Sequence, residues 1–408
     1  MITPVSRTAS EPRNVARAAW LILAVLLLFS IAAPLNQFKV PPIMPVLMSA
    51  LGVSAAGAGL LMSVYAVTGL ILALPAGFIF QKAGYRATGL LAGGSIVLGA
   101  GLGALSQGVG GLLAGRVIEG IGTSFMAVLA PAIIAQWFVT QRRGTAMGIW
   151  AAWVPVGSTA MLIMAPGLAQ TGSWRTVWWF GACYAVVVTA LYLIFVRPPA
   201  PNAAPAASHP AAGARAEDVN AAHVLRNRDI WLVATAFGAF NAAVIGFATY
   251  MPTFLATQRG LSLTQAALVA SIPTLITIFS APGGGILSDR IGSRKKPYLV
   301  GLALAAVLLP LTGAVRGGAL LSLVTISGLV LGLVPTNIFA AAVEATGDER
   351  QGGMAMAVVM VGQNAGMLIG PIIFGALVDS AVGWPAAFAS LSLMALLGLL
   401  AGWLARTR

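Results

Sequence analysis

The feature that most constrains this chain is a series of apolar stretches, each roughly 20 residues long and separated from the next by a short polar or basic cluster. Stretches such as VLLLFSIAA (25–33) and AVVVTALYLIFV (185–196) are continuously apolar, whereas the strands of a membrane β-barrel alternate apolar and polar residues. Only 8% of the residues are charged, against about 25% in a soluble domain. The pattern therefore predicts an all-α polytopic membrane protein.

The apolar stretches define a set of expected membrane-spanning helices, which lie at 18–48, 54–80, 87–106, 111–136, 145–169, 176–197, 229–257, 263–288, 298–315, 319–344, 353–378 and 385–405. The first is too long for a straight crossing, and its PPIMP segment (41–45) either bends it or marks its exit from the hydrocarbon. No small-residue cleavage site follows the first apolar run, so we expect a retained helix rather than a signal peptide.

Basic residues are distributed unequally between the two sides of the membrane. The chain has 23 Lys and Arg residues, and the connections on one side hold only Arg175, Arg259 and Arg316. Because Lys and Arg concentrate in cytoplasmic connections, we expect both termini in the cytoplasm, with the protein in a bacterial inner membrane. This topology accounts for the net charge of +13, so the lipid bilayer is the expected surrounding and no nucleic-acid partner is needed. We expect a monomer.

Side chains that carry hydrolytic, redox or metal chemistry are scarce. Cys183 stands alone in an apolar stretch, and His209 and His223 both fall in a polar segment. Without a cluster of His, Cys or paired carboxylates in the spans, we expect no enzymatic activity, no catalytic residues, no metal and no cofactor.

That polar segment, residues 198–228, is rich in Pro and Ala and carries scattered charges. Such a composition cannot bury a core, so it predicts a flexible cytoplasmic linker. The linker separates an expected N-terminal six-helix bundle (1–197) from an expected C-terminal six-helix bundle (229–408).

The two halves resemble each other at a nearly constant offset. GFIFQKAGYR (77–86) aligns with GILSDRIGSR (285–294), and QRRGTAMG (141–148) aligns with ERQGGMAM (349–356), both at a shift of 208 residues. Parallel repeats related by an axis along the membrane normal are one architecture of secondary transporters, in which two similar bundles rock about a central site. The repeat therefore predicts two six-helix bundles with pseudo-twofold symmetry.

The two aligned loops and the stretch GRVIEGIG (115–122) resemble the signature motifs of the major facilitator superfamily. The resemblance covers nearly the whole chain and implies the twelve-helix transporter fold of that family. It implies gating or structural roles for the loop residues Gly77, Gly84, Arg86, Gly285, Asp289, Arg290, Gly292 and Arg294. In the first loop Gln81 stands where the family usually has an aspartate that bridges the two bundles on the cytoplasmic face. The resemblance therefore implies a weaker bridge in this half, resting on hydrogen bonds.

The stretch from LNQFKVPPIMP onward, together with AQWFVTQRRGTAMGI, is similar to the anion:cation symporter and cyanate or nitrate permease branches of the family. Those branches tend to carry a charged residue in the middle of the first helix. Here Lys39 supplies the only such charge, while Asn36 and Gln37 occupy positions that often hold an acid and a base.

Three charged residues lie within expected spans. Arg116 and Glu119 are three residues apart, so they share a helix face and can neutralise each other. The pair is either a brace between helices or a proton-coupling site built on Glu119, a carboxylate whose protonation depends on burial and on its cationic neighbour. Lys39 either snorkels to the membrane surface or binds an anion beside Asn36, which lies on the same helix face. Arg116 is also a candidate substrate-binding residue, and the three charges together leave the interior at a net positive balance that favours an anion.

Uncharged polar and aromatic residues complete the candidate substrate site. They are Tyr65, Trp153, Asn241, Asn337, Gln363 and Asn364. Each either lines a cavity with a few convergent polar groups or only packs between helices. Trp178 and Trp179, at the start of the sixth span, are expected in the aromatic belt at the membrane surface.

These features favour a secondary active transporter that moves a small organic or inorganic anion by alternating access, with proton symport. The first alternative is proton-driven efflux of amphipathic or hydrophobic compounds, although WVPVGSTAMLIMAPGL (153–168) matches the exporters' glycine- and proline-rich fifth-helix motif poorly. A transporter-like receptor or a passive pore is a third interpretation.

Overall fold

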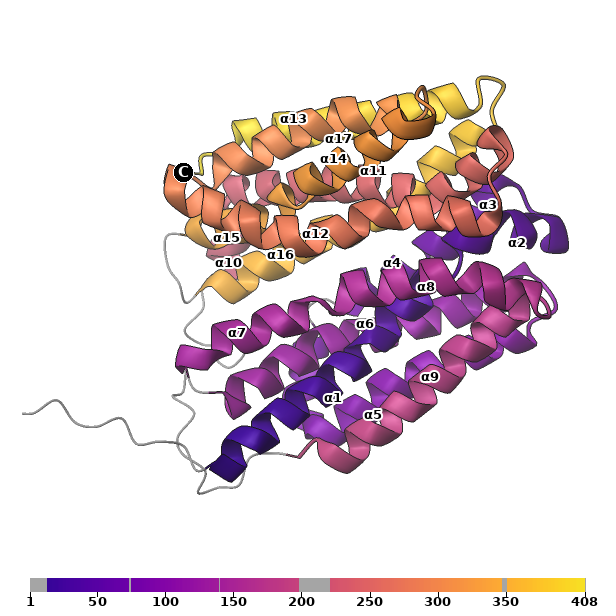
Figure 1. Ribbon diagram of the computed structural model, residues 1–408. Helices are drawn as coiled ribbons and strands as arrows, with labels where there is room; N and C mark the ends of the chain where they lie inside the picture. The colour runs from indigo at the N-terminus through magenta and orange to yellow at the C-terminus, as the bar shows by residue number, and fades with distance from the viewer. Residues whose placement is uncertain (1–12, 73–74, 139, 198–220, 347–350, 408) are drawn as a thin grey trace, which may run out of the picture.

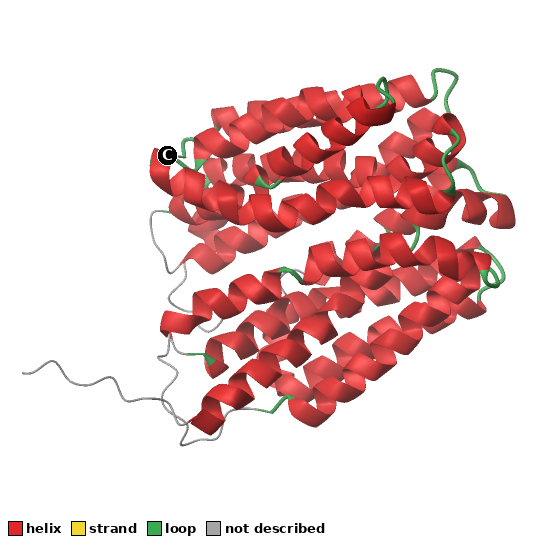
Figure 2. Ribbon diagram, viewed as in Figure 1, coloured by secondary structure: helices red, strands yellow, loops and turns green. Residues whose placement is uncertain are grey.

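A computed structural model describes residues 13–72, 75–138, 140–197, 221–346 and 351–407. Within these ranges all regular secondary structure is helical, as Figure 2 shows. The first half of the chain forms α1 (Arg13–Gln37), the 3₁₀ turn η1 (Pro41–Ile43), α2 (Met44–Leu51), α3 (Ala55–Ser63), α4 (Tyr65–Leu72), α5 (Pro75–Leu105), α6 (Val109–Trp137), α7 (Thr140–Ala151), α8 (Trp153–Gln170) and α9 (Trp174–Phe195).

The second half forms α10 (Ala221–Arg226), α11 (Arg228–Arg259), α12 (Leu263–Ile291), α13 (Lys295–Leu311), α14 (Gly317–Leu331), α15 (Leu333–Glu344), α16 (Gly352–Val378) and α17 (Trp384–Leu404). The described helical segments include 11 that are long and apolar enough to cross a membrane. The ninth expected span, 298–315, corresponds to α13, which has 17 residues and is not among them. The prediction of an all-α polytopic membrane protein is confirmed.

The helices form two bundles, which Figure 1 shows one above the other, with α1 and α5 to α9 in the lower one and α10 to α17 in the upper one. The short helices α2 and α3 of the first half lie at the right of the view, where α3 packs against α16. In the first bundle α5 packs along α6 and α9, and α1 packs along α8 and α9. In the second, α11 packs along α16 and α17, and α12 packs along α14. The expected linker falls mostly on residues 198–220, which lie outside the described residues, and α10 follows it. The boundaries 1–197, 198–228 and 229–408 therefore stay a prediction.

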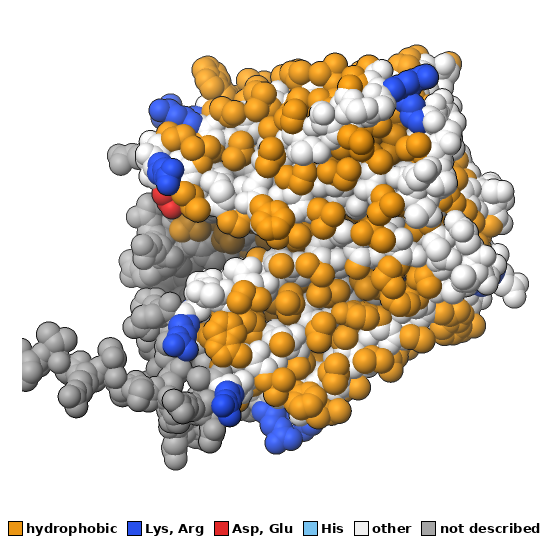
Figure 3. Space-filling model, viewed as in Figure 1, with side chains coloured by type: hydrophobic (Ala, Val, Ile, Leu, Met, Phe, Trp, Pro, Cys, Tyr) orange, Lys and Arg blue, Asp and Glu red, His pale blue; other side chains and the backbone are white. Residues whose placement is uncertain are grey.

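The two bundles meet mainly at one end of the molecule. There α16 packs against α3 and α4, α12 packs against α8, and α11 packs against η1. At the opposite end, the main contacts of α7 are with α1 and α6 of its own bundle. Figure 3 shows the surface hollowed between the bundles at that end, on the left of the view. The molecule is thus closed at the η1 end and open at the other.

The first span is broken by its prolines, a few residues earlier than the PPIMP segment suggests. The α-helix ends at Gln37, and the chain passes through residues 38–40 into η1 and α2. Pro41 has no backbone N–H, so it cannot donate to the carbonyl of Gln37 four residues earlier. The break begins after Gln37, before Pro41, although Val40 itself has helical backbone angles.

The turn between the second and third spans depends on Gly84. Helical residues precede and follow it within α5, but Gly84 itself has φ 74° and ψ −177°. This is a region of backbone space that essentially only glycine occupies. The glycine therefore allows the chain to reverse between two helices without a longer loop.

We expect Gly84→Ala to lower the free energy of unfolding by about 1–3 kcal/mol, because a side chain is strained at this φ. A Cβ at Gly84 would have no neighbour within 4 Å, so the effect is conformational rather than steric. Gly94→Ala is the matched control, since Gly94 is helical and equally open, and alanine is the better helix former. Thermal unfolding in detergent measures both, and equal stability of the two variants would contradict the interpretation.

Candidate functional site

The broken end of α1 leaves backbone carbonyls that need donors inside the first bundle. Arg116 of α6 supplies them: its Nη2 donates to the carbonyl of Gln37 at 2.7 Å, and its Nη1 donates to the carbonyl of Asn36 at 2.6 Å. Its Nε donates to the carbonyl of Leu61 in α3 at 2.9 Å. One guanidinium thus replaces the donor that Pro41 lacks and ties α1, α3 and α6 together.

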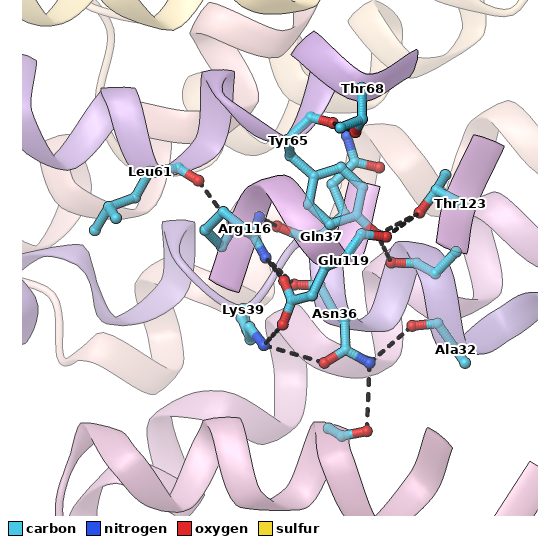
Figure 4. A network of polar contacts seen from close by, with 12 residues as sticks. Ala32, Asn36, Gln37, Lys39, Leu61, Tyr65, Thr68, Arg116, Glu119 and Thr123 are labelled. Carbon is cyan, nitrogen blue, oxygen red and sulfur yellow. Dashed lines mark hydrogen bonds and ion pairs between the residues drawn. The ribbon is translucent and has the colours of Figure 1, made fainter. Parts of the chain in front are cut away.

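Glu119, one turn along α6, carries the opposite charge. Its Oε2 lies 2.7 Å from Nη1 of Arg116, which confirms that the two residues share a helix face and pair. Its Oε1 lies 2.5 Å from Nζ of Lys39. The carboxylate therefore bridges the two cations, as Figure 4 shows. All three side chains are 0% exposed.

Lys39 lies in the break itself, between α1 and η1, and points into the bundle instead of toward lipid. Besides Glu119 it donates to Oδ1 of Asn36 at 3.1 Å and sits 4.7 Å from the ring of Trp178. The snorkelling alternative is thus wrong for this conformation, because an ammonium at the surface would be exposed. Trp178 is also fully buried, so the expectation that it belongs to the surface belt is wrong, whereas Trp179 is exposed.

Asn36 is held so that its side-chain amide oxygen, Oδ1, faces Lys39. Its Nδ2 donates to the carbonyls of Ala32 at 2.9 Å and Gly181 of α9 at 3.3 Å. A Cβ at Gly181 would lie 2.2 Å from Oδ1 of Asn36, so only glycine allows this approach of α9 to α1. The amide orients the ammonium.

Tyr65 closes the network from α4. Its ring lies 4.5 Å from the guanidinium carbon of Arg116, its hydroxyl donates to the carbonyl of Ala33 at 3.0 Å, and the same hydroxyl bonds Thr123 of α6. We name the set Asn36, Lys39, Tyr65, Arg116 and Glu119 the charge network. It contains two cations and one carboxylate in a bundle interior that lies at membrane depth, where unpaired charge is costly.

The other candidate binding residues do not join the charge network. Trp153 stacks on Trp150 at a centroid distance of 5.5 Å. Asn241 of α11 and Asn364 of α16 each donate to a carbonyl of their own helix, at 2.8 Å and 2.9 Å. A Cβ at Gly69 of α4 would lie 2.3 Å from Oδ1 of Asn364, so this amide reaches the surface between the bundles.

Asn337 of α15 is buried in the second bundle, where its Nδ2 donates to the carbonyls of Gly284 at 3.3 Å and Leu333 at 2.7 Å. Its Oδ1 is buried without a hydrogen-bond donor among the described residues. Gln363 lies on α16 and is partly buried. These amides belong to the second bundle, whereas the charge network belongs entirely to the first.

The second of the two repeated loops forms a charged cluster at the open end. Arg294 lies 2.5 Å from Oδ1 of Asp289 and 3.2 Å from Oε1 of Glu344. The carboxylates raise the pKa of Arg294, first through its hydrogen bond with Asp289. Gly292 ends α12 with φ 67°, Gly285 lies within that helix, and Arg290 is exposed.

In the first loop Arg86 donates to the carbonyl of Leu193 at 3.3 Å. Gly77 falls in α5, but its surroundings and the side chain of Gln81 lie outside the described residues. The effect of replacing the family's aspartate by Gln81 therefore stays a prediction.

Sequence reasoning missed three features of this site. The role of Trp178 under Lys39, the donation of Arg116 to the broken end of α1, and the approach of Gly181 to Asn36 all depend on how helices pack. The missing N–H of Pro41 was the one local signal, because it predicts that the carbonyl four residues earlier needs another donor.

We expect Arg116→Ala to lower the free energy of unfolding by about 3–5 kcal/mol, because it removes one partner of a buried ion cluster and leaves carbonyls without a donor. Arg116→Lys should recover little of this, since an ammonium lacks the planar fork that reaches several oxygens at once. Thermal unfolding in detergent measures both, with the exposed Arg142→Ala as control. Full stability of Arg116→Lys would show that charge alone matters.

This chain is similar in sequence to known membrane transporters. A hexuronate transporter of Bacillus subtilis (strain 168) is 24% identical over 357 residues, which cover 84% of each chain. A probable sulfoacetate transporter of Cupriavidus necator, SauU, is 22% identical over 380 residues, covering 88% of this chain and 87% of the relative. An MFS-type efflux pump of Mycolicibacterium smegmatis is 31% identical over 200 residues, covering 48% of this chain and 45% of the pump.

A crystal structure of a bacterial homolog of the human lysosomal transporter Spinster, in an inward-facing and occupied conformation, matches with a TM-score of 0.77 over 97% of each chain. The sequence identity is 15%, so this likeness shows the fold alone. A family model described as Major Facilitator Superfamily matches residues 20–354 and 255–408. The chain therefore belongs to this superfamily of membrane transporters.

Proposed function

We propose that the protein carries a small organic anion across the membrane by alternating access, in symport with protons. The observation that carries the proposal is the buried carboxylate of Glu119 held between Lys39 and Arg116 (Figure 4). A site that already holds one carboxylate between two cations has the chemistry to hold another.

Lys39 is the group that takes the anion. Its ammonium has three donors and is held by Glu119, Asn36 and the face of Trp178, all of which are side chains. Arg116 is bound instead to three backbone carbonyls, so it has little freedom to turn toward a substrate. We assign Arg116 to bracing and Lys39, with Asn36 as its positioning residue, to binding.

Glu119 is the proton acceptor in this proposal. With Glu119 ionised, the charge network sums to +1, and protonation of Glu119 raises the sum to +2. The substrate anion then replaces the charge that the proton neutralised, so the buried charge returns to its earlier value. Protonation and anion binding favour each other for this electrostatic reason.

The relatives support an anionic substrate, since the hexuronate and sulfoacetate of their names are both anions. Asn364 of the second bundle would face such a substrate across the interface, because its amide reaches Gly69 of the first bundle. Asn241, Asn337 and Gln363 are the further polar groups of that bundle. An apolar cavity with a few polar groups is the usual setting for a small ligand.

Figure 3 shows basic side chains of both bundles at the open end of the molecule. Lys82, Arg142 and Lys296, near the first residues of α5, α7 and α13, are exposed. Because basic residues favour the cytoplasmic side, we place the hollow and both termini in the cytoplasm of a bacterial cell, in a monomer of the inner membrane. The repeated loops at this end would form the cytoplasmic gate. In this orientation the conformation is inward-facing.

Efflux of amphipathic compounds is the second candidate. It is favoured by the 31% identity to an efflux pump, although the match covers less than half of either chain. The two functions differ in what the charge network does, because an apolar substrate has no group to exchange with Glu119.

We expect wild-type proteoliposomes to accumulate a carboxylate or sulfonate anion when the outside is more acidic, and to ignore drug-like cations. Lys39→Ala should reduce anion binding by about tenfold or more, since it removes a charged hydrogen-bond donor. Its controls are Lys39→Arg, for fold and charge, and the exposed Lys296→Ala. Anion uptake that survives in Lys39→Ala would contradict the binding assignment.

Glu119→Gln imitates the protonated carboxylate, so we expect it to bind the anion at all pH values and to lose uptake driven by the pH gradient. In the wild type the affinity for the anion should rise as pH falls, because acid protonates Glu119 and releases Lys39. Equal dependence on the pH gradient in both proteins would remove Glu119 from the coupling step.

A further inference from the structure

At the closed end of the molecule, a carboxylate of the second bundle caps a helix of the first. Asp379 follows the last residue of α16, and its Oδ1 and Oδ2 accept hydrogen bonds from the backbone N–H groups of Ala55 at 3.0 Å and Ala56 at 2.8 Å. These are the first two residues of α3. Initial N–H groups of a helix have no partner within it, and the positive end of the helix dipole favours an anion there.

The internal repeat shows that this contact is a departure from symmetry. Ser54, the N-cap of α3, corresponds to Ser262, the N-cap of α12, at the repeat shift of 208. In α12 the side chain of Gln265 completes a capping box with Ser262. Its counterpart in α3 is Gly57, which has no side chain to do this.

The counterpart of Asp379 differs as well. The same shift places Thr171 at the end of α8, where the threonine hydroxyl donates to the carbonyl of Leu168 in its own helix at 2.9 Å. The repeat relates the seam where α16 contacts α3 to the seam where α8 contacts α12. Only the first of these two seams has a carboxylate, Asp379, bound across the bundles among the described residues. The first N–H groups of α3 are capped by a residue of the second bundle, Asp379. The start of α12 is capped by its own residues, Ser262 and Gln265.

Tyr250 of α11 strengthens the same seam. Its fully buried hydroxyl donates to the carbonyl of Ala55 at 2.7 Å. A Cβ at Gly59 or at Gly375 would lie 2.0 Å or 2.1 Å from this hydroxyl, so glycine on both sides lets the helices close around it. Separation of the bundles at this end would break all three hydrogen bonds together.

We propose that Asp379, with Tyr250, is a latch that holds the bundles closed at this end and sets the resting balance between the two conformations of the transport cycle. The proposal rests on the alternating access proposed above, but it needs neither an anion nor a proton. Asp379 acts as a positioning residue for α3. When the closed end opens, the N–H groups of Ala55 and Ala56 lose the carboxylate and must bond to water instead.

The test measures the distance between the bundles at the closed end by double electron–electron resonance in lipid nanodiscs. Spin labels are placed at Gln107 and Val382, which are both exposed, in a Cys183→Ala background because Cys183 is itself exposed. No substrate is added. The wild type should show mainly the short distance.

Asp379→Asn keeps the shape of the side chain and removes its charge, and we expect it to raise the ratio of long to short distances by about three- to tenfold. Tyr250→Phe should shift the ratio in the same direction by a smaller factor. Thr171→Val, at the repeat-related position, should leave it unchanged. Anion binding by Asp379→Asn is measured in a separate experiment. The distance ratio tests the latch and the binding measurement tests the proposed substrate, so failure of one is not taken for failure of the other.

An unchanged ratio in folded Asp379→Asn would overturn the latch, as would an equal shift in Thr171→Val. If Asp379→Asn does not fold, Tyr250→Phe decides the question, because it removes one hydroxyl of the seam and keeps the packing. An unchanged ratio in that variant would then count against the latch.

Discussion

Two backbone carbonyls at the broken end of α1 determine where the buried charges of the first bundle lie. Pro41 cannot donate to the carbonyl of Gln37, and at membrane depth no bulk water is available to replace the missing donor. Arg116 bonds this carbonyl and that of Asn36. The guanidinium brings a full charge into the interior, which Glu119 neutralises, and the second oxygen of Glu119 pairs with Lys39. The break before Pro41 thus leads to a buried ion cluster whose hydrogen bonds join α1, α3 and α6.

The same cluster makes the distribution of buried charge asymmetric. Among the described residues, the fully buried charged side chains belong to the first bundle, whereas the second presents amides such as Asn241 and Asn364. The seam at the closed end is also asymmetric, because Asp379 bonds α3 while its repeat counterpart Thr171 bonds its own helix. The two bundles share one repeat but have different roles in this proposal. The first bundle binds the charge of the substrate, and the contact between the bundles at the closed end sets the resting conformation.

The sequence predicted most of the spans and the pairing of Arg116 with Glu119, because hydrophobic length and helical spacing are local properties. It left Lys39 undecided, since the rise along a helix gives a depth but not the neighbour at that depth. The break before Pro41 changes the direction of the chain at Lys39 and turns the ammonium toward Glu119. Trp178 was placed only by its distance from a span end, and its partner Lys39 comes from another segment of the bundle. The partners of Asp379 lie in the other bundle, which no local pattern indicates.

The number of protons taken up when an anion binds shows whether Glu119 and the substrate anion exchange places on Lys39. Calorimetric titration of the purified protein with the transported anion, in buffers of different ionisation enthalpy, gives this number. We expect about one proton per bound anion in the wild type near neutral pH, and none in Glu119→Gln. Anion binding without proton uptake, or uptake that persists in Glu119→Gln, would contradict the claim.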